Sequence, residues 1–176
     1  MPNILPAIAV PLAGLAALLI SAAAVPAQEE GPDTLTESYR DWVVRCVGAG
    51  AGGRSCEMTQ ELRQRDSGQR VLALAVQRGE GDAGQITAIG PFGVRLAEGL
   101  ALTEPEGGAV LADLPFVTCM PDGCIAARAI DAPLLQALRA GTAVEARLVA
   151  MSGETVRLSL SLMGFTAAWE RLGTLR

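Results

Sequence analysis

The four cysteines constrain the fold of this chain most, because they form two pairs that are local in the sequence. Cys119 and Cys124 enclose Met-Pro-Asp-Gly, a turn in which Pro presets φ, Asp bonds its own backbone and Gly takes the left-handed position. Strand-like segments flank this turn, so the two cysteines should lie opposite each other, within disulfide reach. Cys46 and Cys56 enclose a glycine-rich segment that a disulfide would restrain. The sequence therefore favours Cys46–Cys56 and Cys119–Cys124 among the three possible connectivities.

The rival uses of these cysteines are zinc binding and thiol exchange. A zinc site normally has closer ligand spacing, and an oxidising compartment disfavours free thiolates. The chain has no Cys-x-x-Cys motif for thiol exchange. We therefore expect structural disulfides and no metal ligands, and each short loop should contribute about 2–3 kcal/mol of stability.

An apolar leader precedes the cysteines and predicts export. Residues 4–20 are almost entirely Ile, Leu, Ala and Val, and small residues follow up to Ala27. This layout is typical of a signal peptide over residues 1–27, cleaved after Ala27 or Ala24. A retained anchor is the rival interpretation, but Pro6 and Pro11 interrupt an apolar run at the short end of the spanning range. We expect no stable membrane span after cleavage.

Two absences remove most enzyme chemistry. The chain has no His, and all 14 basic residues are Arg. Imidazole bases, imidazole metal ligands, Schiff-base lysines and phosphate-loop lysines are therefore excluded.

The net charge of −5, with no basic stripe, argues against nucleic-acid binding. We predict no cofactor and no catalytic residue, and the binding residues stay unknown.

The mature chain has the pattern of a β domain. Residues 28–38 are polar and predict a flexible lead-in, and residues 39–176 predict the domain. Asp131 as N-cap, Pro133 in the first turn and Gly141 as the stop predict one helix among the strands. The strand-like segments are 42–47, 56–64, 70–77, 85–89, 94–96, 100–103, 115–119, 124–129, 144–150 and 156–162.

The last two strands allow a prediction of register. A three-residue loop, Ser152-Gly153-Glu154, would place Leu148 opposite Leu158 and Ala146 opposite Leu160. Residues 164–172 should close the chain as a short helix, with Phe165 and Trp169 on the core. We therefore predict an all-β, mostly antiparallel sandwich or flattened barrel with one or two short helices, preceded by the apolar signal helix.

Three local features have structural explanations. The glycine-rich segment 48–53 lacks a lysine and predicts a loop, and Trp42 predicts a buried strand residue. Glu57 and Glu61 share a strand face about 13 Å apart, farther than the usual glycosidase pair. A hydrolase would need an acid pair brought together from distant segments.

The chain also resembles the invasion-associated locus B family over residues 39–172. Leu114–Cys124, with its Cys-Met-Pro-Asp-Gly-Cys run, is the most specific segment. The chain departs from the family pattern at Met163, where the family has Lys, and in the glycine-rich first cysteine loop. The other matching segments are Asp41-Trp42, Arg45-Cys46, Cys56–Gln60, Pro91–Val94, Leu134–Gly141 and Leu160–Phe165.

The resemblance implies an exported α-proteobacterial protein in the periplasm, in the envelope or outside the cell. The family name refers to host-cell invasion, and the resemblance transfers no catalytic residue. The leading hypothesis is a non-enzymatic domain that acts through contacts with an unknown protein or envelope partner. An exposed apolar patch or unpaired edge strand would favour it. An apolar cavity between the sheets would favour the second hypothesis, small-ligand binding or a role as an assembly factor. A pocket with clustered carboxylates would favour the third, a hydrolase.

Overall fold

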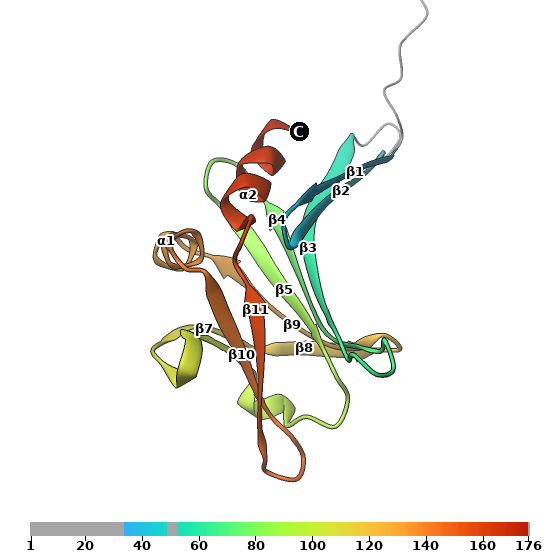
Figure 1. Ribbon diagram of the computed structural model, residues 1–176, viewed down its shortest axis with the longest axis vertical. Helices are drawn as coiled ribbons and strands as arrows, with labels where there is room; N and C mark the ends of the chain where they lie inside the picture. The colour runs from blue at the N-terminus through green and yellow to red at the C-terminus, as the bar shows by residue number, and fades with distance from the viewer. Residues whose placement is uncertain (1–33, 49–52, 176) are drawn as a thin grey trace, which may run out of the picture. The chain divides into compact units, whose positions relative to one another are not determined.

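The computed structural model describes residues 34–48 and 53–175, which form two antiparallel sheets and two short helices (Figure 1). The predicted signal peptide and most of the glycine-rich loop lie outside these residues. Neither sheet closes on itself, so the sandwich is confirmed and the flattened barrel is not.

The larger sheet has seven strands in the order β1-β2-β3-β4-β5-β9-β8. Each strand pairs with its neighbour in antiparallel fashion, and four successive hairpins build the first five strands. Its strands are β1 (Thr34–Tyr39), β2 (Trp42–Gly48), β3 (Arg54–Arg63), β4 (Arg70–Arg78), β5 (Gly84–Gly90), β8 (Phe116–Met120) and β9 (Gly123–Ile130).

The smaller sheet has four strands in the order β11-β10-β6-β7. The chain enters it after β5, returns to the larger sheet after β7, and enters it again after β9. Its strands are β6 (Leu100–Thr103), β7 (Val110–Leu114), β10 (Ala143–Val149) and β11 (Thr155–Ser161). Two 3₁₀ turns, η2 (Leu96–Glu98) and η3 (Pro105–Gly107), flank β6.

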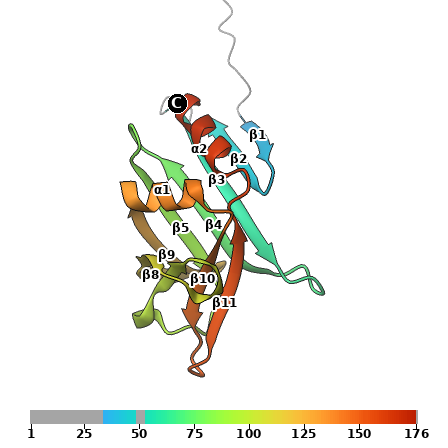
Figure 2. The same cartoon turned by 60° about the vertical axis from the view of Figure 1, so that its left-hand side comes forward.

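Helix α2 packs on β1 to β4 of the larger sheet, and α1 contacts α2 and β7 of the smaller sheet (Figure 2). In α1 (Ala132–Ala140), the Asp131 carboxylate accepts a hydrogen bond from the Leu134 N–H, as the predicted N-cap requires. In α2 (Phe165–Thr174), the side chains of Phe165 and Trp169 are buried, as predicted.

The core lies between the sheets and beneath α2. Trp42 packs edge-to-face on Phe165, with ring centroids 5.3 Å apart, and Phe165 stacks on Trp169 at 6.3 Å. Alternate residues of the strands point inward, as a period of two requires. Large apolar side chains therefore fill the space between the layers.

Gln60 is a buried polar side chain that joins the two sheets. Its Nε2 group donates to the carbonyl oxygens of Asp41 (3.1 Å) and Ser161 (3.0 Å), and its Oε1 accepts from the Ser161 N–H (2.9 Å). The Trp42 indole N–H also donates to the Ser161 carbonyl, at 3.0 Å. β2 and β3 are thereby attached to the end of β11, and both the oxygen and the nitrogen of the Gln60 amide are hydrogen-bonded.

The structure corrects the predicted start of the domain. Residues 34–38, which we expected within a flexible lead-in, belong to β1 and pair with β2. Leu35, Glu37 and Tyr39 are half-buried and alternate with exposed neighbours. The inward Glu37 binds Arg171 of α2, so a charged residue occupies a position where alternation alone predicts an apolar one.

The register of the last hairpin also differs from the prediction. Leu148 lies opposite Val156 and Ala146 opposite Leu158, a shift of two residues that keeps the predicted faces. The Ala150 N–H donates to the Glu154 carbonyl at 2.8 Å, which closes the loop over residues 151–153. Gly153, at φ 91°, takes the last loop position, where a three-residue hairpin loop needs a left-handed residue.

Two shorter segments were also predicted imperfectly. In the expected strand 94–96, Val94 makes one isolated bridge with Ala150, and η2 begins at Leu96. Val110–Leu114 forms β7, which the sequence patterns did not indicate.

Candidate interaction surface

Both predicted disulfides are present, and each joins directly opposed residues of neighbouring strands. Cys46–Cys56 connects β2 to β3, and Cys119–Cys124 connects β8 to β9. Cys46 and Cys124 are buried, whereas Cys119 is exposed. Within the described ranges, no group of His, Cys, Asp and Glu side chains could hold a metal ion. The disulfides thus act as crosslinks of the sheet.

The second disulfide holds β8, which forms one edge of the larger sheet. The strand Phe-Val-Thr-Cys-Met has no charged residue, and Val117 and Met120 are 68% and 54% exposed. A bulge between Phe116 and Thr118 turns Val117 outward. Beyond β8 the described residues provide no further strand, so one row of its backbone groups faces outward unpaired.

The other sheet edges carry charges, which normally discourage pairing with another chain. β1 contains Glu37, β7 contains Asp113 and β11 contains Arg157. Among the edges of the two described sheets, β8 is therefore the one without a charged side chain. The stretch from Val117 to Met120 is its accessible part, because Pro115 and the bulge limit pairing at the beginning.

The turn after β8 is fixed in place by three contacts. Met120 pairs with Gly123, leaving Pro121 and Asp122 as the turn residues. At Gly123 a side chain would collide with the Gly90 carbonyl of β5. The Arg70 guanidinium, at the start of β4, donates to the Asp122 carbonyl at 2.8 Å, and the disulfide completes the clamp. The edge is thus held rigidly without a partner.

A depression of about 350 Å³ lies on the outer face of the larger sheet, over β2 to β5. Small side chains such as Ala73 and Ala75 form part of its floor, and Ile89 lines it toward β9. Ile89 pairs with Ile125, and Ile125 with Thr118. One row of side chains therefore leads from the depression to β8.

The carboxylates of this depression have arginines as neighbours. Arg45 lies directly opposite Glu57 across β2 and β3, and Glu61 forms ion pairs with Arg63 and, at 3.8 Å, with Arg70. A charge-balanced surface of this kind is typical of recognition. It has no carboxyl group held in an apolar pocket, which a general acid of a hydrolase needs.

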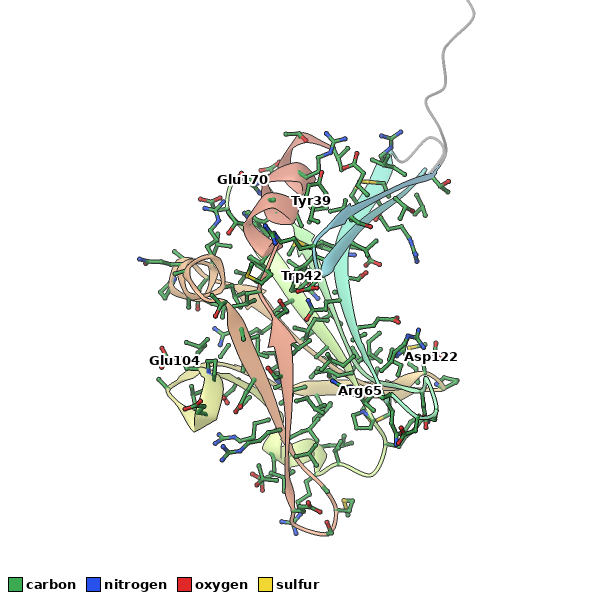
Figure 3. All side chains as sticks on the ribbon, viewed as in Figure 1. Tyr39, Trp42, Arg65, Glu104, Asp122 and Glu170 are labelled. Atoms are coloured by element: carbon green, nitrogen blue, oxygen red, sulfur yellow. A yellow bond between two sulfur atoms is a disulfide. The ribbon has the colours of Figure 1, made fainter. Side chains whose placement is uncertain are left out.

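Arginines also gather at the tip of the hairpin between β3 and β4, where Figure 3 labels Arg65. Arg63 also donates to the Gly68 carbonyl of its own turn at 3.0 Å, whereas Arg65 makes no ion pair with any residue that the structure describes. Arg65 and Asp122 mark the two hairpin tips that Arg70 joins.

A second charged cluster attaches β1 to α2. The Arg171 guanidinium donates two hydrogen bonds to the Glu37 carboxylate, at 2.7 and 2.8 Å, and the Tyr39 hydroxyl donates to it at 2.8 Å. The hydrogen bond from Arg171 lowers the pKa of Glu37 from 4.5 to about 2. The same carboxylate raises the pKa of Tyr39. This cluster is structural, since it keeps the first strand on the sheet.

The fold and its crosslinks define a class, the disulfide-bonded two-sheet β domains with an open, uncharged edge. The chain belongs to the invasion associated locus B (IalB) protein family, whose model matches residues 42–173. This confirms the family predicted from the cysteine segment.

Individual relatives agree with this assignment. An invasion protein B homolog of Brucella abortus (strain 2308) is 35% identical over 162 residues, which cover 92% of this chain and 90% of the relative. Invasion protein B of Bartonella bacilliformis is 32% identical over 152 residues, covering 83% and 78%. The crystal structure of invasion associated protein B from Bartonella henselae superposes with a TM-score of 0.72 at 29% identity, covering 80% of this chain and 96% of that one.

The disulfides and these relatives indicate an extracytoplasmic protein. In the described part of the chain, neither helix has the length and apolar character needed to cross a membrane.

Proposed function

We propose that this protein is a non-enzymatic periplasmic or secreted domain that binds a protein partner by adding a strand of that partner to β8. This proposal rests on the edge strand β8, which has no charged side chain and is held in place by the Cys119–Cys124 disulfide. In strand addition, main-chain hydrogen bonds provide affinity, and the side chains beside the edge provide specificity. Here Val117 and Met120 supply apolar contacts at the edge, and the charges of both signs in the depression lie farther along the same sheet, on β2, β3 and β4.

A small-ligand function has less support. Bulky side chains such as Trp42, Met58 and Phe165 occupy the space between the sheets, where an apolar ligand would bind. The depression lies on the opposite face of the larger sheet, and it is open and charged. The names of the relatives refer to invasion. Strand addition at β8 would provide one molecular step of that process, the contact with a host or envelope protein.

A matched pair of crosslinking sites tests this proposal. Thr118 of β8 and Thr155 of β11 are both exposed threonines on edge strands. A photoreactive amino acid at position 118, in cells that export the protein, should give a discrete crosslinked product, and position 155 should not. Thr118→Lys should prevent partner binding and Thr155→Lys should preserve it. Equal crosslinking from both positions, or equal binding by both lysine variants, would contradict strand addition at β8.

A further inference from the structure

A second exposed surface lies at one end of the sandwich and uses none of the β8 residues. The apolar tip, as we call it, consists of Phe92, Leu96 and Met151, which are 60%, 50% and 66% exposed. Phe92 and Leu96 belong to the connection between β5 and β6, and Met151 to the loop between β10 and β11. Figures 1 and 2 show these two connections projecting at the same end of the sheets.

Backbone hydrogen bonds hold the two connections together. The Arg95 N–H donates to the Val149 carbonyl and the Met151 N–H to the Gly93 carbonyl, both at 2.8 Å. Between these bonds lies the bridge of Val94 with Ala150. The apolar side chains are therefore presented by a fixed, protruding scaffold, which avoids much of the ordering cost of binding.

Arginines without an ion pair lie at the tip and behind it. Arg95, Arg147 and Arg157 form no ion pair with any residue of the described ranges. Arg147 and Arg157 lie directly opposite each other on β10 and β11, three residues before and after the closing pair Ala150–Glu154. At the usual rise this places them about 10 Å behind the loop. Like charges in opposed positions destabilise a strand pair, so an external anion would relieve them.

The tip also carries carboxylates. Glu98 and Glu154 form no ion pair within the described part of the chain. A surface that pairs with both sets of charges must present anions and cations together. Phosphatidylethanolamine does so, with its phosphodiester and its primary ammonium group, above an apolar layer that accepts the three tip side chains.

We propose that the apolar tip docks on a phospholipid bilayer surface containing phosphatidylethanolamine. Phe92, Leu96 and Met151 enter the boundary between headgroups and acyl chains. Arg95, whose guanidinium lies beside Gly153 of the loop, and Arg147 behind it contact lipid phosphates, while the carboxylates of the tip meet ammonium groups. This is peripheral binding without a membrane span, and it leaves β8 free for a protein partner.

Vesicle binding tests the proposal with a matched control. Probe vesicles contain phosphatidylethanolamine and phosphatidylglycerol, and sedimentation measures the bound fraction of the protein. Phe92→Ser with Met151→Ser should lower the partition coefficient at least about tenfold. Val110→Ser with Met163→Ser also removes two exposed apolar side chains, at other places on the surface, and should change it less than about twofold. No sedimentation of the unaltered protein, or equal losses in both double variants, would overturn the proposal.

Two further measurements test whether a headgroup pocket is responsible for binding and whether the tip inserts into the bilayer. Soluble glycerophosphoethanolamine should not displace the protein from the vesicles, since it lacks the apolar layer; displacement would indicate a headgroup pocket and overturn the insertion model. Phe92→Trp should shift its emission to the blue on vesicle addition, because Trp42 and Trp169 are already buried. An unchanged spectrum with bound protein would also overturn the model. Neither result bears on β8, which the crosslinking experiment tests separately.

Discussion

Gln60→Ala should strongly destabilise the domain, because this side chain joins the two sheets. The substitution removes all three hydrogen bonds that Gln60 makes to Asp41 and Ser161. It leaves the Ser161 N–H without its partner, although the Ser161 carbonyl keeps the bond from Trp42. The loss therefore acts where β2, β3 and β11 meet.

The expected cost follows from the number of bonds. At about 1 kcal/mol net for each hydrogen bond, the three bonds of Gln60 amount to about 3 kcal/mol. Gln60 and Ser161 both line a surface depression of about 460 Å³, through which water can reach some of the freed groups. We therefore expect a loss of about 2–3 kcal/mol in unfolding free energy.

Urea unfolding followed by tryptophan fluorescence measures this loss, because Trp42 and Trp169 are buried in the folded state. The matched control is Gln77→Ala, in the neighbouring strand β4. Gln77 is exposed and makes no side-chain hydrogen bond within the described ranges, so its loss should stay within about 0.5 kcal/mol. Equal midpoints for the two variants, with unchanged slopes, would refute the role of Gln60.

Three other outcomes are expected. Cys119→Ser with Cys124→Ser should cost about 2 kcal/mol in urea unfolding, as loop closure predicts for so short a loop; an unchanged midpoint would show that the disulfide does not hold the turn. Because the pKa of Glu37 is lowered from 4.5 to about 2, its contribution to stability is complete above pH 4.5 and is lost as the pH falls toward 2. Glu37→Gln should flatten that part of an acid unfolding curve, and an identical acid profile would exclude the Arg171 contact. Gly164→Ala should lower the melting temperature by several degrees, since the new side chain would collide with the Tyr39 carbonyl; an unchanged melting temperature would contradict the close approach.

Local sequence signals predicted much of the fold. Asp131 and Gly141 marked the ends of the first helix. Pro121, Asp122 and Gly123 indicated the disulfide-linked hairpin of β8 and β9. These features depend on residues close together in the chain, so turn and cap chemistry is sufficient to predict them.

The features that depended on distant partners could not be predicted in this way. β1 was missed because Glu37 points inward toward Arg171, 134 positions away. The register of the last hairpin was missed because Gly153 occupies the third loop position, which the alternation of apolar residues does not determine.

The candidate site could likewise be predicted from the sequence only in part. The sequence placed Cys119 on a strand, but the open side of β8 follows from the pairing of β9 with β5, which turn signals do not indicate. The apolar tip was missed for a similar reason, since Phe92 and Met151 come from loops that only tertiary structure brings together.

Amide hydrogen exchange in the complex with the crosslinked partner is the sharpest test of strand addition at β8. Amide exchange is measured for the free domain and for the complex, with the charged edge strand β7 (Val110–Leu114) as the internal reference. Strand addition should slow exchange between Val117 and Met120 and leave β7 unchanged. Unchanged exchange in β8 together with protection elsewhere would contradict it.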